Sequence, residues 1–482
     1  MWRSRPCLAR SVICLLLLGL LTFLLNLLGS ELLSVGPRDV QITVMGDDFI
    51  DSPGGGPHRK QPVYLPPEGE KSGPPIVVWW TPFTGDRRVE RKCTDGACLF
   101  THSRTEQNNS RTKAFMYYGT DIDWRDLPLP RRRDQFWALL HEESPKNNWI
   151  LASEDGISLF NLTATCSRYS DYPLTTQFLH KLAWLETPVE VETSRKSSEG
   201  LGLVMYLQSD CNPPSDRDSY VQELMKYVTI DSYGKCLHNK DLPGHLVDPL
   251  TFSSKEILSL VSKYKFTLAF ENARCHDYIT EKFWRPLYAG SVPIVLGSPS
   301  IKDWAPTNHS VIVADDFSSP KALAEYLHYL DENDKEYEKY LEYKRTGITS
   351  PLLLGHMHVR KWVVDYIEEG INFIDGFECH VCDQIHRRLR LQSEGLDPLP
   401  LIASGAHYNC LHPRPALKGD GEHSDWMELV SEGARDELSY WRYVARCSAR
   451  KGRALRDSLA GGGTNDSVAL ALYDACHGVV VE

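Results

Sequence analysis

Short runs of apolar residues, separated by polar loops, recur from residue 76 onward and predict a series of buried β-strands. They fall into two sets, with expected strands at Ile76–Trp80, Lys113–Tyr118 and Phe136–Leu140 in the first and at Gly202–Leu207, Lys265–Phe270 and Val292–Leu296 in the second. A polar, serine-bearing stretch, Thr187–Gly200, is the expected connection between the sets. Because one hydrophobic core rarely grows past about 250–300 residues, the pattern predicts two α/β lobes.

The segment Lys265–Gly297 predicts a complete strand, loop, helix and strand unit, whose ligands would sit at the end of the first strand and the start of the helix. That place carries a group of polar side chains, namely Glu271, Asn272, Asp277, Tyr278, Glu281 and Lys282. Backbone N–H groups at Thr280–Lys282 and the helix dipole favour an anion, and Lys282 adds a positive charge. The segment therefore predicts a nucleotide-phosphate site. The alternative is an ordinary βαβ unit whose polar residues occupy a solvated helix start.

The N-terminus carries an apolar stretch, Val12–Leu28, that is broken only by Gly19, Thr22 and Asn26. At about 1.5 Å per residue this stretch crosses most of a bilayer. Three arginines, Arg3, Arg5 and Arg10, precede it, and such charge keeps the short N-terminal side cytosolic. We therefore expect a type II membrane protein with a luminal catalytic region. A cleaved signal peptide is the alternative, although no Ala-x-Ala pattern follows the apolar run.

Other features of the chain agree with a luminal location. Four sequences fit the acceptor pattern for N-glycans, at Asn108, Asn161, Asn308 and Asn465. All of the 13 cysteines except Cys7 and Cys14 follow the apolar stretch, so disulfides are expected. The pairs Cys93/Cys98 and Cys379/Cys382 could alternatively form a four-cysteine zinc site, but their spacings are unequal. The net charge of −11 argues against a nucleic-acid partner.

A second candidate for chemistry is the sequence His141-Glu142-Glu143-Ser144-Pro145, which directly follows an expected strand. A carboxylate at the end of a strand is well placed to accept a proton from an acceptor hydroxyl, and burial would raise its pKa toward neutrality. The alternative is a strand end with two solvated acids.

A third candidate is Arg217, which lies between Asp216 and Asp218 in a turn after the strand Gly202–Leu207. Its guanidinium could bind a diphosphate bidentately, or it could simply pair with the flanking aspartates. The triplets Asp121-Ile122-Asp123 and Asp216-Arg217-Asp218 could hold Mg²⁺ or Mn²⁺, but this signal is weak, and we predict no metal site.

At these residues the sequence resembles the α1,3/4-fucosyltransferases, from about Ile76 to Cys382. The matching motifs are Phe270-Glu271-Asn272, Asp277-Tyr278, Thr280-Glu281-Lys282, Gly290, Val292-Pro293, Glu143-Ser144-Pro145, Ser215 with Arg217, Trp80 with Pro82 and Phe83, and Cys379-x-x-Cys382. The resemblance implies two facing Rossmann-like lobes of the GT-B type, GDP-fucose as co-substrate and no metal or other cofactor. It implies that Glu143 is the general base, that Arg217 and Lys282 bind the diphosphate, and that Asn272, Tyr278 and Glu281 line the nucleotide or fucose site. It also implies disulfides between Cys379 and Cys382 and the cysteines Cys93 and Cys98.

Several stretches, among them HEESPKNN and DYITEKFWRPL, resemble a divergent branch of the family, fucosyltransferases 10 and 11. For this branch the resemblance implies an inverting enzyme that fucosylates Ser/Thr hydroxyls of folded EMI domains in the endoplasmic reticulum. Fucosylation of GlcNAc in N-glycans, in the Golgi, is the alternative. A non-catalytic lectin-like or chaperone module is a second alternative, because Ala273 and Arg285-Pro286 depart from the common donor motif and Pro286 could kink the helix.

The expected organisation follows from these observations. It comprises a cytosolic tail (1–11), a transmembrane signal-anchor (12–29), a Pro/Gly-rich stem (30–75), an acceptor-side lobe (76–195), a GDP-fucose-binding lobe (196–375), a cysteine-pair and helical segment (376–395) and a Gly/Ala/Pro-rich appendage for which no order is predicted (396–482).

Overall fold

A computed structural model describes residues 73–83, 88–198, 200–246, 254–364, 370–417, 432–477 and 479. The expected cytosolic tail, signal-anchor and nearly all of the stem lie outside these residues. Within the described part of the chain, no helix is both long enough and apolar enough to cross a membrane.

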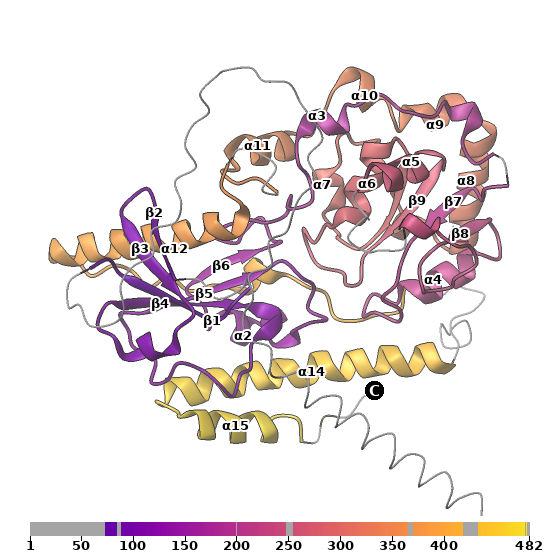
Figure 1. The fold of residues 1–482 in the computed structure, drawn as a ribbon. Helices are drawn as coiled ribbons and strands as arrows, with labels where there is room; N and C mark the ends of the chain where they lie inside the picture. The colour runs from indigo at the N-terminus through magenta and orange to yellow at the C-terminus, as the bar shows by residue number, and fades with distance from the viewer. Residues whose placement is uncertain are drawn as a thin grey trace, which may run out of the picture. The chain divides into compact units, whose positions relative to one another are not determined.

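The first lobe is built around a six-stranded sheet, counted over the described residues, in the order β2-β3-β1-β4-β5-β6 (Figure 1). Its strands are β1 (Ile76–Thr81), β2 (Val89–Lys92), β3 (Ala97–Thr101), β4 (Thr112–Tyr118), β5 (Phe136–His141) and β6 (Leu162–Thr165). Neighbouring strands are parallel except for β2, which pairs with β3 in the antiparallel sense. Every residue of β1, β5 and β6 is buried, as expected for parallel strands covered on both faces.

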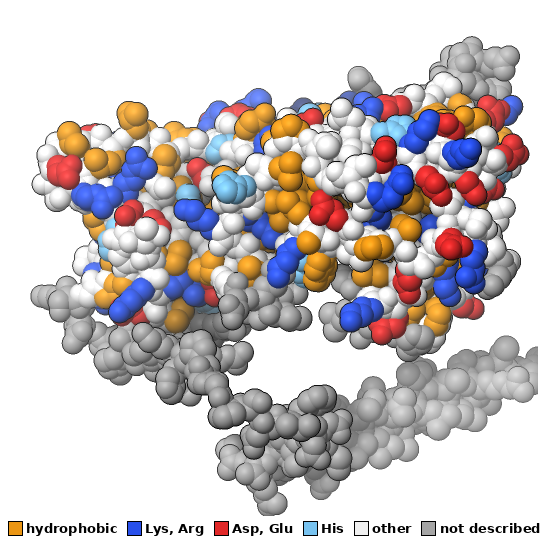
Figure 2. Space-filling model, turned by 90° about the horizontal axis from the view of Figure 1, so that it is seen from above, with side chains coloured by type: hydrophobic (Ala, Val, Ile, Leu, Met, Phe, Trp, Pro, Cys, Tyr) orange, Lys and Arg blue, Asp and Glu red, His pale blue; other side chains and the backbone are white. Residues whose placement is uncertain are grey.

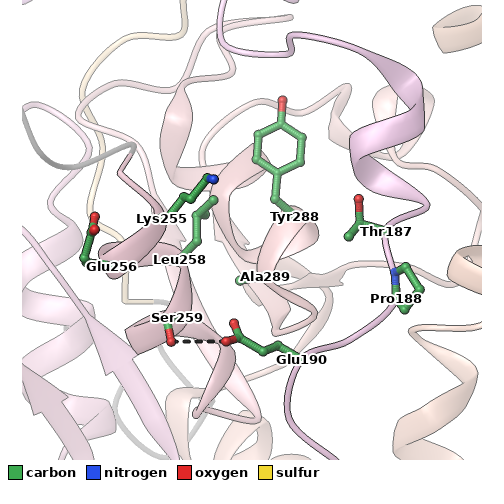
Figure 3. Close-up of a pocket in the computed structure, with 9 residues that line it drawn as sticks. All are labelled: Thr187, Pro188, Glu190, Lys255, Glu256, Leu258, Ser259, Tyr288 and Ala289. Carbon is green, nitrogen blue, oxygen red and sulfur yellow. Dashed lines mark hydrogen bonds between the residues drawn. The ribbon is translucent and has the colours of Figure 1, made fainter. Parts of the chain in front are cut away.

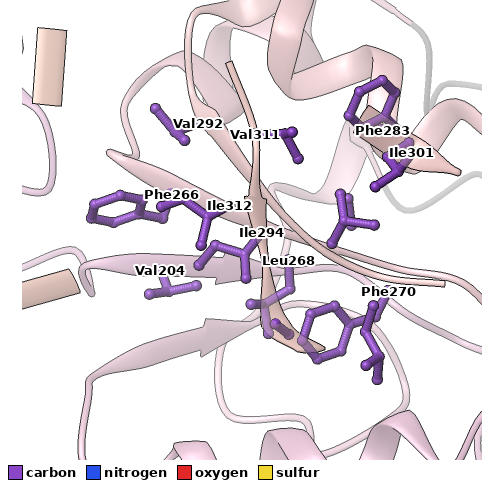
Figure 4. Packing of buried hydrophobic residues seen from close by; sticks show 14 of the residues in the cluster. Val204, Phe266, Leu268, Phe270, Phe283, Val292, Ile294, Ile301, Val311 and Ile312 are labelled. Atoms are coloured by element: carbon purple, nitrogen blue, oxygen red, sulfur yellow. The ribbon is translucent and has the colours of Figure 1, made fainter. Parts of the chain in front are cut away.

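The second lobe contains five strands in its described part, all parallel, in the order β11-β10-β9-β7-β8. They are β7 (Val204–Tyr206), β8 (Ile230–Ser232), β9 (Phe266–Phe270), β10 (Val292–Leu296) and β11 (Ile312–Val313). Side chains from β9 and β10 pack with those of neighbouring helices into one apolar cluster (Figure 4). Phe283 and Ile301 belong to this cluster, so the helices on either side of β10 are anchored to the sheet.

Helices connect the strands and cover both sheets. Their bounds are α2 (Glu154–Ile157), α3 (Leu182–Leu185), α4 (Arg217–Leu224), α5 (Lys255–Ser262), α6 (Glu281–Ala289), α7 (Ile301–Trp304), α8 (Pro320–Glu332), α9 (Asp334–Lys339), α10 (Tyr343–Thr346), α11 (Pro351–Val359), α12 (Phe373–Ser393), α14 (Glu432–Ala460) and α15 (Asn465–Asp474). The short 3₁₀ helices η3 (Trp149–Ala152) and η8 (Gly405–Tyr408) lie in loops of the first lobe and the C-terminal region.

The two faces of the first sheet are covered by segments from the C-terminal part of the chain. Phe377, Val381 and Ile385 of α12 pack on one face. Leu455 of α14 and Val468 of α15 join the cluster on the other face. The chain therefore returns to the first lobe after it has completed the second, as the orange and yellow helices in Figure 1 show.

The α/β prediction is confirmed, and so are the expected strands. The predicted unit at Lys265–Gly297 is formed by β9, α6 and β10, and α6 begins one residue after Thr280. Pro286 lies inside α6 and offers no amide donor to the preceding turn, yet the helix continues to Ala289. The predicted domain boundaries stay predictions.

Five disulfides join cysteines of the described residues: Cys93–Cys379, Cys98–Cys382, Cys211–Cys236, Cys275–Cys410 and Cys447–Cys476. The first two connect β2, β3 and α12, which is the grouping that the resemblance implied for these four cysteines. Because a cysteine in a disulfide has no thiolate to offer, the alternative of a four-cysteine zinc site does not fit this arrangement.

The four predicted glycan acceptors differ in their surroundings. Asn108 and Asn308 are exposed. The side-chain amide of Asn161 instead accepts a hydrogen bond from the main-chain N–H of Trp137 at 2.8 Å and donates one to the Leu401 carbonyl at 2.8 Å. Asn465 makes a similar reciprocal pair of bonds with the Leu127 backbone, both at 3.1 Å. In the folded protein the amides of Asn161 and Asn465 are therefore engaged in backbone contacts.

Candidate active site between the two lobes

The second-lobe part of the site is the loop from Glu271 to Thr280 and the start of α6. Glu271 is 2% exposed, and its carboxylate accepts hydrogen bonds from the Thr280 N–H and hydroxyl, both at 2.9 Å. The Thr280 hydroxyl also accepts from the Lys282 N–H at 3.3 Å, so it caps α6. Burial raises the pKa of Glu271, and the nearby Lys282 ammonium opposes this rise. These bonds fix where the helix begins and which way Lys282 leaves it.

Lys282 and Glu281 form the charged pair at this helix start. The Lys282 ammonium lies 3.0 Å from the Glu281 carboxylate and 3.9 Å from that of Glu271. Burial would raise the pKa of Glu281, but Lys282 and Arg285 outweigh it and hold the pKa at about 2. Glu281 is therefore an anion at every physiological pH. The Lys282 side chain is 18% exposed, so an entering anion can reach its ammonium.

The first-lobe part of the site is the pair Glu142 and Glu143, directly after β5. Burial raises the pKa of Glu143 most, the Lys282 ammonium offsets part of this, and the carboxylates of Glu281 and Asp210 add to the rise. These three groups all belong to the second lobe, so the charge of Glu143 is coupled across the junction of the lobes. A half-buried carboxylate with a raised pKa suits a general base.

Glu142 is the neighbouring carboxylate, and it is the more strongly perturbed of the two. Burial raises its pKa to about 7, and Glu143 contributes to the rise. One of its oxygens accepts a hydrogen bond from the Tyr118 hydroxyl at 3.2 Å. The other oxygen is buried without a hydrogen-bond partner among the described residues. The family resemblance singled out Glu143, whereas the strong perturbation of Glu142 was not predicted, because adjacency in sequence does not show which side chain faces the core.

Two ion pairs tie the lobes together beside these groups. Lys146, three residues after Glu143, pairs with Asp210 of the loop after β7. Arg168 of the first lobe pairs at 2.6 Å with Asp277, which lies in the loop from Glu271 to Thr280, here called the donor-side loop. Each pair joins segments more than 60 residues apart. The loop after β5 that carries the candidate base Glu143, here called the catalytic loop, is therefore tied to the second lobe, and the donor-side loop is tied to the first lobe.

The structure brings Glu143, Glu281 and Lys282 together, but it surrounds the other predicted residues differently. Arg217 is 1% exposed, and its guanidinium donates to the carbonyls of Phe270 at 2.8 Å and Asp210 at 2.7 Å. Its contact with a diphosphate stays a prediction, since such a contact would compete with these bonds.

The remaining two predicted donor residues, Asn272 and Tyr278, lie in the same loop. Tyr278 is 3% exposed and belongs to the core cluster of the first lobe, together with Ala273. The side-chain oxygen of Asn272 is buried and has no hydrogen-bond partner among the described residues. Asn272 therefore offers an acceptor that a bound ligand could satisfy, whereas Tyr278 packs between the lobes.

A cavity of about 250 Å³ opens beside the start of α6. Aromatic side chains line it, and Glu281 and Arg285 supply its charged groups; the aromatic residues include Phe178, Trp184, Trp284 and Tyr288. A second hollow, of about 460 Å³, lies at the other end of α6, near Tyr288 and Ala289 (Figure 3). It contains none of the predicted site residues, and its Ser259 hydroxyl donates to Glu190 at 3.5 Å. The first cavity, which Glu281 helps to line, is thus the one that adjoins the charged groups at the start of α6.

Three of the four aspartates suggested as metal ligands have other partners. Asp216 accepts from the Ser219 hydroxyl at 2.6 Å, and Asp218 accepts from the Tyr206 hydroxyl at 2.9 Å. Asp123 pairs with Arg125. Among the described residues, the groups with metal-like spacing are Cys98, Cys382 and His386, and Cys211, Asp218 and Cys236. Each contains a disulfide, so neither has the thiolates that such a site needs.

Side chains of both signs cover one face of the molecule. Basic and acidic groups are interspersed on the face seen from above in Figure 2, and apolar side chains gather near the middle of that face.

The Lys282 ammonium at the start of α6 and the Glu143 carboxylate with its raised pKa, set between two α/β lobes, fit a glycosyltransferase. Two family models match the chain, the fucosyltransferase N-terminal model over residues 71–176 and the glycosyltransferase family 10 (fucosyltransferase) C-terminal model over residues 193–394. The chain belongs to this family and is a fucosyltransferase.

Relatives and a solved structure were also found. GDP-fucose protein O-fucosyltransferase 3 of Gallus gallus is 48% identical over 347 residues, which cover 71% of this chain and 72% of that protein. The Homo sapiens protein of the same name is 48% identical over 343 residues, covering 70% and 71%. The match to a crystal structure of an α1,3-fucosyltransferase with GDP-fucose covers 67% of this chain and 94% of that chain, at 15% identity and with a TM-score of 0.38.

The buried carboxyl of Glu142 should make the stability of the protein depend on pH. Folding raises its pKa from 4.5 to about 7. The contribution of the protonated carboxyl to the stability of the folded protein is therefore complete below pH 4.5 and is lost as the pH rises through 7. The free energy of unfolding should therefore fall between pH 5 and pH 8. We expect this fall to be about 1–3 kcal/mol smaller in Glu142→Gln, measured by urea denaturation. Exposed Glu332→Gln is the control, and an unchanged pH dependence in Glu142→Gln would contradict the assignment.

Proposed function

We propose that the protein transfers L-fucose from GDP-β-L-fucose to Ser/Thr hydroxyls of folded, extracellular-type protein domains, by a single displacement that inverts the anomeric centre. The observation that carries this proposal is the coupling of Glu143, from one lobe, to Lys282 and the start of α6, from the other. The names of the relatives support GDP-fucose as donor and protein as acceptor. EMI domains are the acceptors that the sequence resemblance favours.

In the proposed step, the acceptor oxygen attacks the anomeric carbon while Glu143 takes the hydroxyl proton. The bond from that carbon to the diphosphate breaks, and GDP leaves with the bonding electrons. One displacement converts the β-linked donor into an α-fucoside. The raised pKa of Glu143 makes this carboxylate a better proton acceptor than a solvated one.

The donor would bind along the start of α6. The N–H groups of Thr280 and Lys282, which the sequence suggested as anion ligands, already donate to Glu271 and to the Thr280 hydroxyl. Lys282 and the helix dipole would therefore stabilise the developing charge on the diphosphate, and we propose that no metal ion is required. The aromatic cavity next to Glu281 has the size and stacking surfaces for part of the nucleoside, and Glu281 can accept hydrogen bonds from ribose or sugar hydroxyls. The buried oxygen of Asn272 supports a further polar contact.

The proposed location rests on the apolar stretch Val12–Leu28 and on the three arginines that precede it. We propose a single-pass type II protein of the endoplasmic reticulum membrane, or alternatively of the Golgi, with the two lobes in the lumen facing each other as in GT-B enzymes. The disulfides support an oxidising compartment.

A direct test is fucose incorporation from labelled GDP-fucose, with a folded EMI domain and an N-acetyllactosamine glycan offered in parallel. We expect label on the protein acceptor, in a linkage to Ser or Thr that mass spectrometry of the peptides identifies. Unfolded, reduced EMI domain is the control for fold dependence. Label on the glycan alone would support α1,3-fucosylation of GlcNAc and contradict the protein acceptor.

Glu143→Gln should reduce transfer by about 100-fold or more, because the amide cannot accept the proton. The melting temperature and the affinity for GDP should stay close to those of the unmodified protein, since Gln has the same shape. Glu142→Gln, at the adjacent position, should lose far less activity. The reverse order of the two variants would assign the base to Glu142.

Lys282→Ala should act mainly on the donor. One charge-assisted hydrogen bond contributes about 1.5–3 kcal/mol, so we expect the KM for GDP-fucose to rise about tenfold or more. Lys302→Ala removes an exposed lysine of α7 that pairs with Asp316, and it is the matched control. Equal donor dependence in both variants would remove Lys282 from the diphosphate site, and retained activity in EDTA is expected throughout.

A further inference from the structure

A segment that follows both family-model matches runs through the active site. Residues 401–417, which we call the C-terminal strap, come after residue 394, where the second match ends. The strap first binds the first lobe, where the Ala403 N–H donates to the Phe160 carbonyl at 3.0 Å and the Ser167 hydroxyl donates to the Ala406 carbonyl at 2.7 Å. Its path thus begins along the edge of the sheet beside β6.

Tyr408 of the strap contacts the main chain of Glu143, the proposed catalytic base. Its hydroxyl donates a hydrogen bond of 2.6 Å to the main-chain carbonyl of Glu143. The side chain is 1% exposed, and its ring lies 5.3 Å from the ring of His141. Because the ring is packed on all sides, the hydroxyl is held in one place, and so is the carbonyl that it binds.

The next residues of the strap hold the donor-side loop. Cys410 forms a disulfide with Cys275, and the Leu411 N–H donates to the Arg274 carbonyl at 2.8 Å. The strap then reaches the second lobe, where the Ala416 N–H donates to the Asp216 carboxylate at 2.9 Å. One continuous segment therefore contacts the catalytic loop, the donor-side loop and the second lobe in turn.

We propose that Tyr408 is a positioning residue for the transfer reaction, which fixes the backbone at Glu143 so that its carboxylate meets the acceptor hydroxyl. This inference rests on the proposed function, in which Glu143 is the base. The position of a base decides rate more than binding, since a displacement of about 1 Å can cost about 100-fold in rate. The strap is thus an added part of the active site, joined to the family domains.

The test is Tyr408→Phe, which deletes the hydroxyl and keeps the packed ring. We expect kcat to fall about tenfold or more, while the KM for GDP-fucose and the affinity for GDP change less than twofold. Tyr337→Phe is the matched control: Tyr337 is also fully buried, and its hydroxyl donates to the Lys265 carbonyl at 2.8 Å, at the end of β9 away from the donor-side loop. Both variants should shift the melting temperature by a similar amount, so lost stability alone cannot explain a fall in kcat confined to Tyr408→Phe.

Three outcomes are distinguishable when Glu143→Gln is measured beside these variants. A large loss in Glu143→Gln and a fall in kcat only for Tyr408→Phe support the inference. A large loss in Glu143→Gln with normal kcat for Tyr408→Phe, or equal falls in Tyr408→Phe and Tyr337→Phe, overturns it and leaves the proposed function intact. Full activity in Glu143→Gln overturns the proposed function and, with it, the role of Tyr408.

Discussion

Asp277 is the buried charge on which the arrangement of the two lobes depends. Its carboxylate is 1% exposed and accepts hydrogen bonds from Arg168 of the first lobe and from Trp304 and Ser300 of the second. Burial would raise its pKa, but these partners outweigh it and lower the pKa. A buried carboxylate is stable only when its oxygens are satisfied, so the loop that carries Asp277 is confined to the one place where all the donors meet. The backbone of Asp277 is left-handed, with φ of 63°, a conformation that Asp adopts more readily than most residues.

The position of this loop in turn sets the electrostatics of the site. Lys282 lies among the carboxylates of Glu143, Glu271 and Glu281, and Arg285 adds a second positive charge beside Glu281. The ammonium of Lys282 offsets part of the negative charge of these carboxylates. A diphosphate that binds Lys282 would draw on the same positive charge, so the carboxylates would lose part of this stabilisation. That loss would raise the pKa of Glu143 further and make it more ready to accept a proton. Donor binding and activation of the base would thus be coupled through one lysine.

The parts of the fold that sequence predicted are those with a local signal. The runs at Ile76–Trp80 and Val292–Leu296 are buried on both faces, so their residues are continuously apolar, and the helical spacing after Thr280 is equally local. The charged groups at Glu143 and Lys282 could be found because strand ends and helix starts are predictable places for ligands. The burial of Arg217 could not be found, because it depends on the carbonyls of Phe270 and Asp210, which only the folded chain brings to the guanidinium.

The C-terminal region shows the same limit most clearly. Its Gly/Ala/Pro-rich composition predicts no order, yet Ala416 and Leu417 belong to the core cluster of the second lobe and Tyr408 to that of the first. The sequence of the strap carries no helical or strand period, although Gly405–Tyr408 form the 3₁₀ helix η8, and several of its residues have partners far along the chain, as in Cys275–Cys410. Trp441 of α14 extends this pattern by donating to the Asn212 carbonyl of the second lobe at 2.9 Å. A region without local periodicity can therefore still be ordered in the folded chain, because contacts such as those of Tyr408 with Glu143 and of Ala416 with Asp216 satisfy polar groups that the two lobes present.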